Sequence, residues 1–112
     1  MQDNDKVLQE INAAFSIRFS DYVGAYLYGS RVTGNAHDGS DYDVVLVFGT
    51  LDYAKEMAIA GLISDISYRL NIFLDCKLFA SQGKKSIEYF RTHVNPVFIS
   101  RAIDSGVYYA RK

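Results

Sequence analysis

Two aspartates separated by one residue, Asp41 and Asp43, form a pair of acids that could bind a metal ion. Residues i and i+2 of a β-strand point to the same face, so this pair predicts two carboxylates side by side. Two anions held in this way repel each other, and a divalent cation removes the repulsion. Hard oxygen ligands of this kind suit Mg²⁺ or Mn²⁺. The pair therefore predicts a metal site.

A glycine-serine pair, Gly29-Ser30, is separated from Asp41 by ten residues and lies at the end of a predicted strand. Glycine lets the backbone approach a ligand closely, and Ser30 can donate a hydroxyl and a backbone N–H. If a helical turn begins at Ser30, its free N–H groups form a phosphate site. A phosphate-binding turn beside a carboxylate pair that binds metal is what chemistry on a nucleoside triphosphate requires.

A third acid, Asp75, lies between apolar neighbours in the predicted strand 71–80. An acid in that position is costly to bury unless it has a partner. If this strand lies beside the strand of Asp41 and Asp43, Asp75 completes a three-carboxylate site. It would then bind a second metal ion or take the proton from an attacking hydroxyl. The structural alternative is a salt bridge from Asp75 to Lys77 or to an arginine.

These acids must be held by helices and strands, which the spacing of the apolar residues predicts. The patterns predict helices over 3–20, 51–69, 85–92 and 96–104, strands over 22–28, 41–48 and 71–80, and an edge strand or packed tail at 107–109. Thr50 is the expected N-cap of the second helix. Strands with helices between them predict a two-layer α/β, or α+β, domain over residues 1–112 with a small mixed sheet. We expect helices mainly on one face of that sheet and the active site on the other.

Composition excludes several classes of function. The chain has 112 residues, of which 49% are apolar and 22% charged, the mixture of an ordinary globular domain. A formal net charge of −1 gives no support to generic binding of nucleic acid or of an anionic membrane, which needs a basic surface. One cysteine allows no intrachain disulfide, the first five residues are polar and acidic, and no run of about 18 apolar residues occurs. We therefore expect a cytoplasmic protein without membrane contact.

The stretches Gly-Ser-Arg-Val-Thr-Gly at 29–34 and Ser-Asp-Tyr-Asp-Val-Val at 40–45 resemble the signature of the DNA polymerase beta-type nucleotidyltransferases. They are similar in particular to the minimal nucleotidyltransferases (MNT). These single-domain proteins are often paired with a small helical HEPN protein in prokaryotic toxin–antitoxin systems. The resemblance extends along most of the chain, with Asp75 in the place of the family's third acid and 95–108 similar to its C-terminal helix and tail.

The resemblance implies a polymerase beta-like fold and transfer of a nucleoside monophosphate, usually AMP from ATP, to a hydroxyl with release of pyrophosphate. In several MNT–HEPN pairs the acceptor is a tyrosine of the HEPN ribonuclease toxin, which the modification silences. It further implies that Asp41, Asp43 and Asp75 hold two Mg²⁺ ions, or Mn²⁺ ions. Asp75 would be a metal ligand or the catalytic base. The nucleotide contacts it implies are Gly29, Ser30, Arg31 and Ser40.

Two other functions stay open at this stage. One is a nucleotidyltransferase that modifies a small molecule such as an aminoglycoside, although such enzymes usually add a helical domain that shapes the acceptor pocket. The other is a non-catalytic antitoxin that neutralises its partner by binding.

A calcium loop starting at Asp38 is excluded because its twelfth residue is Gly49 rather than glutamate. A P-loop is excluded because neither Gly-Lys-Ser nor Gly-Lys-Thr occurs.

Overall fold

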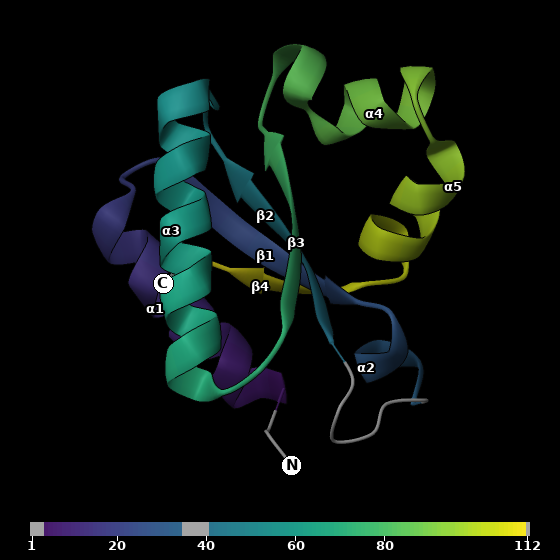
Figure 1. The fold of residues 1–112 in the computed structure, drawn as a ribbon. Helices are drawn as coiled ribbons and strands as arrows, with labels where there is room; N and C mark the ends of the chain where they lie inside the picture. Colours follow the sequence, from purple (N-terminus) through teal and green to yellow (C-terminus); the bar gives the residue numbers. More distant parts are fainter. Residues whose placement is uncertain (1–3, 35–40, 112) are drawn as a thin grey trace.

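The computed structural model describes residues 4–34 and 41–111 (Figure 1). In chain order the elements are α1 (Asn4–Arg18), β1 (Tyr22–Tyr28), α2 (Ser30–Thr33), β2 (Tyr42–Phe48), α3 (Tyr53–Leu70), β3 (Leu74–Ala80), the 3-10 helix η1 (Gly83–Lys85), α4 (Ile87–His93), α5 (Pro96–Ile99), the π-helix η2 (Ser100–Asp104) and β4 (Val107–Ala110). No helix among the described residues is long and apolar enough to cross a bilayer.

The strands form one mixed sheet in the order β3-β2-β1-β4. β2 and β3 run parallel, joined by the crossover helix α3, whereas β1 is antiparallel to both β2 and β4. The predicted fold class, an α+β domain with a small mixed sheet, is confirmed. The segment at 107–109 forms the edge strand β4 and is not a packed tail.

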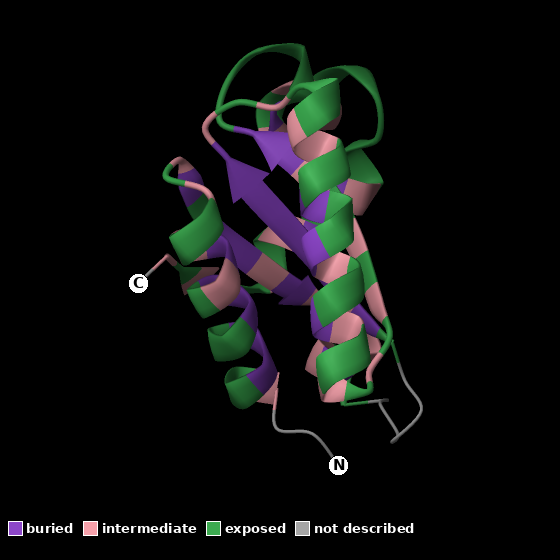
Figure 2. Cartoon of the chain, turned by 60° about the vertical axis from the view of Figure 1, so that its left-hand side comes forward, coloured by how far each residue is buried: buried purple, intermediate pink, exposed green. Residues whose placement is uncertain are grey.

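The two long helices, α1 and α3, cover one face of the sheet (Figures 1 and 2). Alternate residues of β2 point into the core beneath them and are fully buried: Tyr42, Val44, Leu46 and Phe48. The helices contribute apolar residues at helical spacing: Val7, Leu8, Ile11 and Phe15 from α1, and Ile59, Leu62 and Ile66 from α3. Each such side chain stabilises the fold by about 1.5–3 kcal/mol relative to leaving it exposed. This core fixes which face of β2 is left for chemistry.

The short C-terminal helices lie against the other face of the sheet (Figure 1). Their contacts form a second, smaller apolar cluster whose buried members are Val45, Val47, Phe79, Ile99 and Ala102. The helix predicted over 96–104 divides into α5 and the π-helix η2, both packed in this cluster. The second face is thus shared between these helices and the acids that precede and begin β2 and β3.

Local polar contacts set the helix ends. The prediction that Thr50 is the N-cap of α3 is wrong. The cap is Asp52, whose carboxylate accepts a hydrogen bond from the backbone N–H of Lys55 at 2.8 Å. Thr50 lies two residues too early because the chain first turns back past Asp21, to which the Thr50 N–H donates at 3.0 Å. The last strand is held from α1, since the Asn12 amide donates to the carbonyl of Ala110 at 2.9 Å.

Candidate active site

β1 ends, and β2 and β3 begin, at the same end of the sheet, where they place polar residues in a single row. Asp43 of β2 is in register with Tyr28 across the antiparallel pair and with Asp75 across the parallel pair. Neighbouring strands lie about 4.8 Å apart, so the carboxylates of Asp43 and Asp75 are adjacent. Because Tyr42 and Val44 are buried under α1 and α3, Asp43 between them points to the opposite face. The predicted juxtaposition of the β2 and β3 acids is present.

Like charge is concentrated in this row. Burial, followed by the negative charges of Asp75 and Asp41, raises the pKa of Asp43, and only Lys77 acts in the other direction. The salt bridge foreseen as the structural alternative for Asp75 does exist, with Lys77 Nζ 3.9 Å from Asp75 Oδ1. Both side chains are about half exposed (54% and 53%), so the pair contributes at most about 1 kcal/mol. It does not neutralise the group of acids.

The glycine turn after β1 packs directly on Asp43. Gly29 has a φ of +80°, which side chains other than glycine rarely adopt. A Cβ at this position would collide with Asp43 Oδ2 and lie 3.2 Å from Asp43 Cγ. Its carbonyl accepts from the N–H groups of Val32 and Thr33 at 3.0 and 3.2 Å, which builds the short helix that begins at Ser30. The predicted helical turn after the glycine-serine pair is confirmed, and glycine is required there on two counts.

A pocket of about 620 Å³ opens beside this turn. Its walls come from the turn, from α2 and from the C-terminal helices: Tyr28, Gly29, Val32, Thr33, Phe98, Arg101 and Ser105. The Tyr28 ring meets the Phe98 ring edge to face, with centroids 5.6 Å apart. Burial, then the charges of Asp43 and Asp75, raise the pKa of Tyr28 to about 12, so its phenol keeps its proton near neutrality. Sequence reasoning missed Tyr28, although its place at the end of β1, just before Gly29, was a signal.

The remaining predicted nucleotide contacts lie differently. Arg31 is buried, and its guanidinium carbon lies 4.0 Å from the centroid of the Tyr42 ring, which belongs to the core under α1 and α3. Its carbonyl accepts from the Asn4 amide at 3.0 Å. The structure therefore brings Gly29 and the acids of β2 and β3 together and places Arg31 in a packing contact beneath the turn. Ser40 lies outside the described residues.

The three predicted acids provide the kind of donor atoms that a divalent cation needs. Asp41, Asp43 and Asp75 offer only carboxylate oxygens, which suit Mg²⁺ and Mn²⁺. The raised pKa of Asp43 reflects a repulsion that a cation would relieve. Within 4–34 and 41–111, no three His, Cys, Asp or Glu side chains are gathered in the geometry of a formed metal site. The three acids thus fit a divalent cation in chemistry, and Asp43 and Asp75 also in register.

Comparison with known proteins gives one family and a set of similar folds. The family described as polymerase beta, nucleotidyltransferase, matches residues 9–104. A crystal structure of the toxin-antitoxin MntA-HpeT, in a mutant with two aspartates replaced by glutamate, has 18% identity and a TM-score of 0.62, covering 89% of this chain and 69% of that one. A crystal structure of a toxin-antitoxin with AMP-PNP has 19% identity, a TM-score of 0.63 and the same coverage. Comparison with curated proteins gave no match.

Proposed function

The chain belongs to the polymerase beta nucleotidyltransferase family, and on that premise we propose that it transfers AMP from ATP to a tyrosine of a toxin partner. The partner in this proposal is a helical protein of the HEPN type, and the chain is its antitoxin. Both solved structures named above are toxin-antitoxins, and one of them holds AMP-PNP, an analogue of ATP. The observation that carries the proposal is the Gly29 turn packed on Asp43, in a row with Asp75.

In this proposal the nucleotide lies on the β1 side of the row. Gly29 and Ser30 hold the triphosphate by close backbone approach and by the serine hydroxyl, with Ser40 as a further contact. Arg31 acts from beneath, by fixing α2 through its packing on Tyr42. The base and ribose occupy the pocket of about 620 Å³ beside the turn, against aromatic side chains. Its volume falls in the range of about 300–1,000 Å³ found for small-ligand sites.

Asp41, Asp43 and Asp75 would hold two Mg²⁺ ions, with Mn²⁺ as a substitute. Such ions, when bound, stabilise negative charge on the attacking and leaving oxygens of an in-line displacement. The tyrosine oxygen forms a bond to the α-phosphorus of ATP. The bond from that phosphorus to the bridging oxygen breaks, and pyrophosphate leaves with the electron pair. The phenol proton passes to the exposed carboxylate of Asp75, which acts as the base.

This assignment treats residues 1–112 as one nucleotidyltransferase domain working in the cytoplasm, where ATP and Mg²⁺ are at hand. A protein acceptor is preferred to RNA or DNA because the net charge is −1. A protein acceptor is also preferred to a small molecule because the acids lie on an open face, with half the Asp75 side chain exposed. A folded partner that docks there would supply the positioning that a second domain otherwise provides.

The test is incubation of the chain with ATP, Mg²⁺ and the helical protein encoded next to it in the genome. Intact-mass spectrometry should show the partner gaining one or more adenylyl groups, and peptide mapping should place them on tyrosine. Asp75→Asn should abolish the gain, whereas Asp65→Asn, on the exposed side of α3, should not. Full neutralisation of the partner by Asp75→Asn without a change in mass would mean that the chain acts by binding alone.

A further inference from the structure

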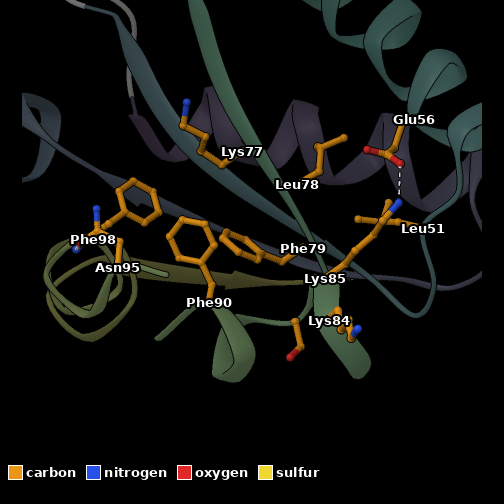
Figure 3. A pocket seen from close by; sticks show the side chains of 11 residues that line it. Leu51, Glu56, Lys77, Leu78, Phe79, Lys84, Lys85, Phe90, Asn95 and Phe98 are labelled. Atoms are coloured by element: carbon orange, nitrogen blue, oxygen red, sulfur yellow. Dashed lines mark hydrogen bonds and ion pairs between the residues drawn. The ribbon is translucent and has the colours of Figure 1, made fainter. Parts of the chain in front are cut away.

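A second pocket lies along β3 (Figure 3). In the sheet, β3 is separated by β2 from β1, the strand that ends at the Gly29 turn. It has a volume of about 440 Å³ and runs from β3 across to α4 and α5. Lys77, which lines it, lies two residues after Asp75 on the same face of β3 and 3.9 Å from its carboxylate. The mouth of this pocket therefore adjoins the row of acids.

One wall of this pocket is aromatic. The rings of Phe79 and Phe90 meet edge to face with centroids 5.3 Å apart, and those of Phe90 and Phe98 with centroids 5.7 Å apart. Figure 3 shows the three rings side by side along one wall. Edge-to-face and stacked contacts with these rings favour another aromatic ring as the occupant.

The rim of this pocket is basic. Lys77, Lys84 and Lys85 line it, against one acid, Glu56, to which Lys85 is bonded at 2.9 Å. Within the described ranges, 4–34 and 41–111, Lys84 makes no ion pair, and its side chain is exposed. Because Lys77 is paired with Asp75 and Lys85 with Glu56, the remaining positive charge of the rim is that of Lys84, which favours an occupant that carries carboxylates next to its aromatic ring.

The direction of the chemistry also points to this pocket. In an in-line displacement the attacking oxygen and the leaving pyrophosphate lie on opposite sides of the α-phosphorus. If the outer phosphates rest on the Gly29 turn after β1, the acceptor must approach from the β3 side. The pocket beside Lys77 is on that side, next to Asp75, the base of the proposed step.

We propose that the pocket along β3 is the acceptor site and takes a tyrosine flanked by acidic residues of the partner protein. The tyrosine lies against Phe90 with its hydroxyl toward Asp75, and its acidic neighbours lie at Lys84 and Lys85. This inference rests on the proposed function and names the kind of segment that the enzyme modifies. Transfer follows the step given above, with the adenylyl group passing to that hydroxyl and pyrophosphate leaving.

The test uses the full chain and a fluorescent peptide, Glu-Asp-Tyr-Glu-Asp, beside a matched peptide with Gln and Asn in place of the acids. The acidic peptide should shift the amide NMR signals of Lys84, Lys85 and Phe90. Lys84→Glu should weaken its binding by about tenfold or more, as like charges at an interface do. Arg18→Glu, an exposed charge reversal at the end of α1, should not. Binding of AMP-PNP with Mg²⁺ should be unchanged in both variants.

Three results with the peptides would overturn the acceptor site: no binding of the acidic peptide, shifts at other residues, or equal binding of the two peptides. A loss of AMP-PNP binding in Lys84→Glu would assign the pocket to the nucleotide and overturn it as well. The proposed function is measured separately, by adenylyl transfer from ATP to the peptide. Binding at Lys84 without transfer would support the docking site and contradict the proposed chemistry.

Discussion

The β1–β2 pair has a glycine packed against an aspartate at each end, and the two corners differ in charge. At one end Asp21, before β1, lies against Gly49, where a Cβ would be 3.1 Å from the carboxylate oxygen Oδ2. At the other end Asp43 lies against Gly29. Asp21 accepts hydrogen bonds from Lys55 Nζ and from the Thr50 N–H. These bonds outweigh burial and lower the pKa of Asp21, whereas burial and two acids raise the pKa of Asp43.

The surrounding charges indicate that the carboxylate of Asp21 is structural and that the carboxylate of Asp43 is available to a ligand. Asp21 is neutralised inside the chain and ties the first turn of α3 to the start of β1. Asp43 has acids for neighbours and a single half-exposed lysine nearby, so its charge is compensated only when something positive binds. Glycine and aspartate in contact are common to both corners, and the surrounding charge separates them.

The largest expected effect is on catalysis. Asp43→Asn should lower Mg²⁺-dependent AMP transfer by at least about 100-fold, because it removes a charged group from the place where transition-state charge is stabilised. Asp21→Asn should leave the transfer rate within a few-fold of the unchanged chain. Transfer is measured with ATP labelled at the α-phosphate. Similar losses in the two variants would remove the distinction between the corners.

AMP transfer should be next most sensitive to substitution at Gly29, the glycine packed against Asp43. Gly29→Ala forces a side chain into a positive φ and into the Asp43 carboxylate, so AMP transfer should fall by at least about tenfold, with strain of about 1–3 kcal/mol. Gly34→Ala is the matched control, because Gly34 has a φ of +87° and open space where its Cβ would stand. It should lose stability and keep its activity. Equal activity in the two alanine variants would contradict the close approach at Gly29.

Asp21, packed against Gly49 at the other end of the β1–β2 pair, should affect the free energy of unfolding. Asp21→Asn should reduce the free energy of unfolding at neutral pH by about 1.5–3 kcal/mol, the value of a hydrogen bond to a charged group. Because the pKa of Asp21 is lowered by folding, its contribution is present above the usual value of 3.8 and is lost as the pH falls through the lowered pKa. Denaturant unfolding of the two proteins should therefore converge at low pH. A constant difference across pH would contradict this role for Asp21.

The smallest effect should be a gain. Asp43→Asn should raise the free energy of unfolding of the metal-free chain near neutral pH by about 0.2–1 kcal/mol, because it relieves like charges on neighbouring strands. A raised folded pKa makes the ionised acid unfavourable to folding, so this gain grows as the pH rises from 3.8 through the raised pKa. Below pH 3.8 both proteins carry an uncharged group here, and the gain should vanish. Saturating Mg²⁺ should also reverse it. A loss of stability at neutral pH would contradict the repulsion.

Much of the active corner can be predicted from the sequence because it rests on local rules. Strand alternation predicts that Asp43 and Val45 share one face and that Tyr42 and Val44 share the other, as the structure has it. The glycine-serine pair predicts the turn into α2. The pairing of Asp43 with Asp75 is only conditional at that level, since it depends on β3 returning beside β2 after the 18 residues of α3.

Tertiary contacts decide what local rules miss. Arg31 follows the serine as a nucleotide ligand would, but the Tyr42 ring below α2 offers its guanidinium a face to pack on. Thr50 and Asp52 both suit an N-cap, and the return of the chain past Asp21 selects Asp52. Asp21 itself shows no sign of its role in sequence, because Lys55 reaches it only when α3 folds onto the sheet.

The most direct test of the account is where a paramagnetic cation binds. Mn²⁺ should be titrated with AMP-PNP into isotope-labelled chain while the broadening of each amide NMR signal is recorded. The signals of Gly29, Asp43 and Asp75 should broaden first, those of Asp21 and Lys55 should stay sharp, and Asp43→Asn should remove the effect. Broadening centred on Asp21, or an unchanged pattern in Asp43→Asn, would contradict the assignment of the Gly29–Asp43–Asp75 corner as the nucleotidyl-transfer centre.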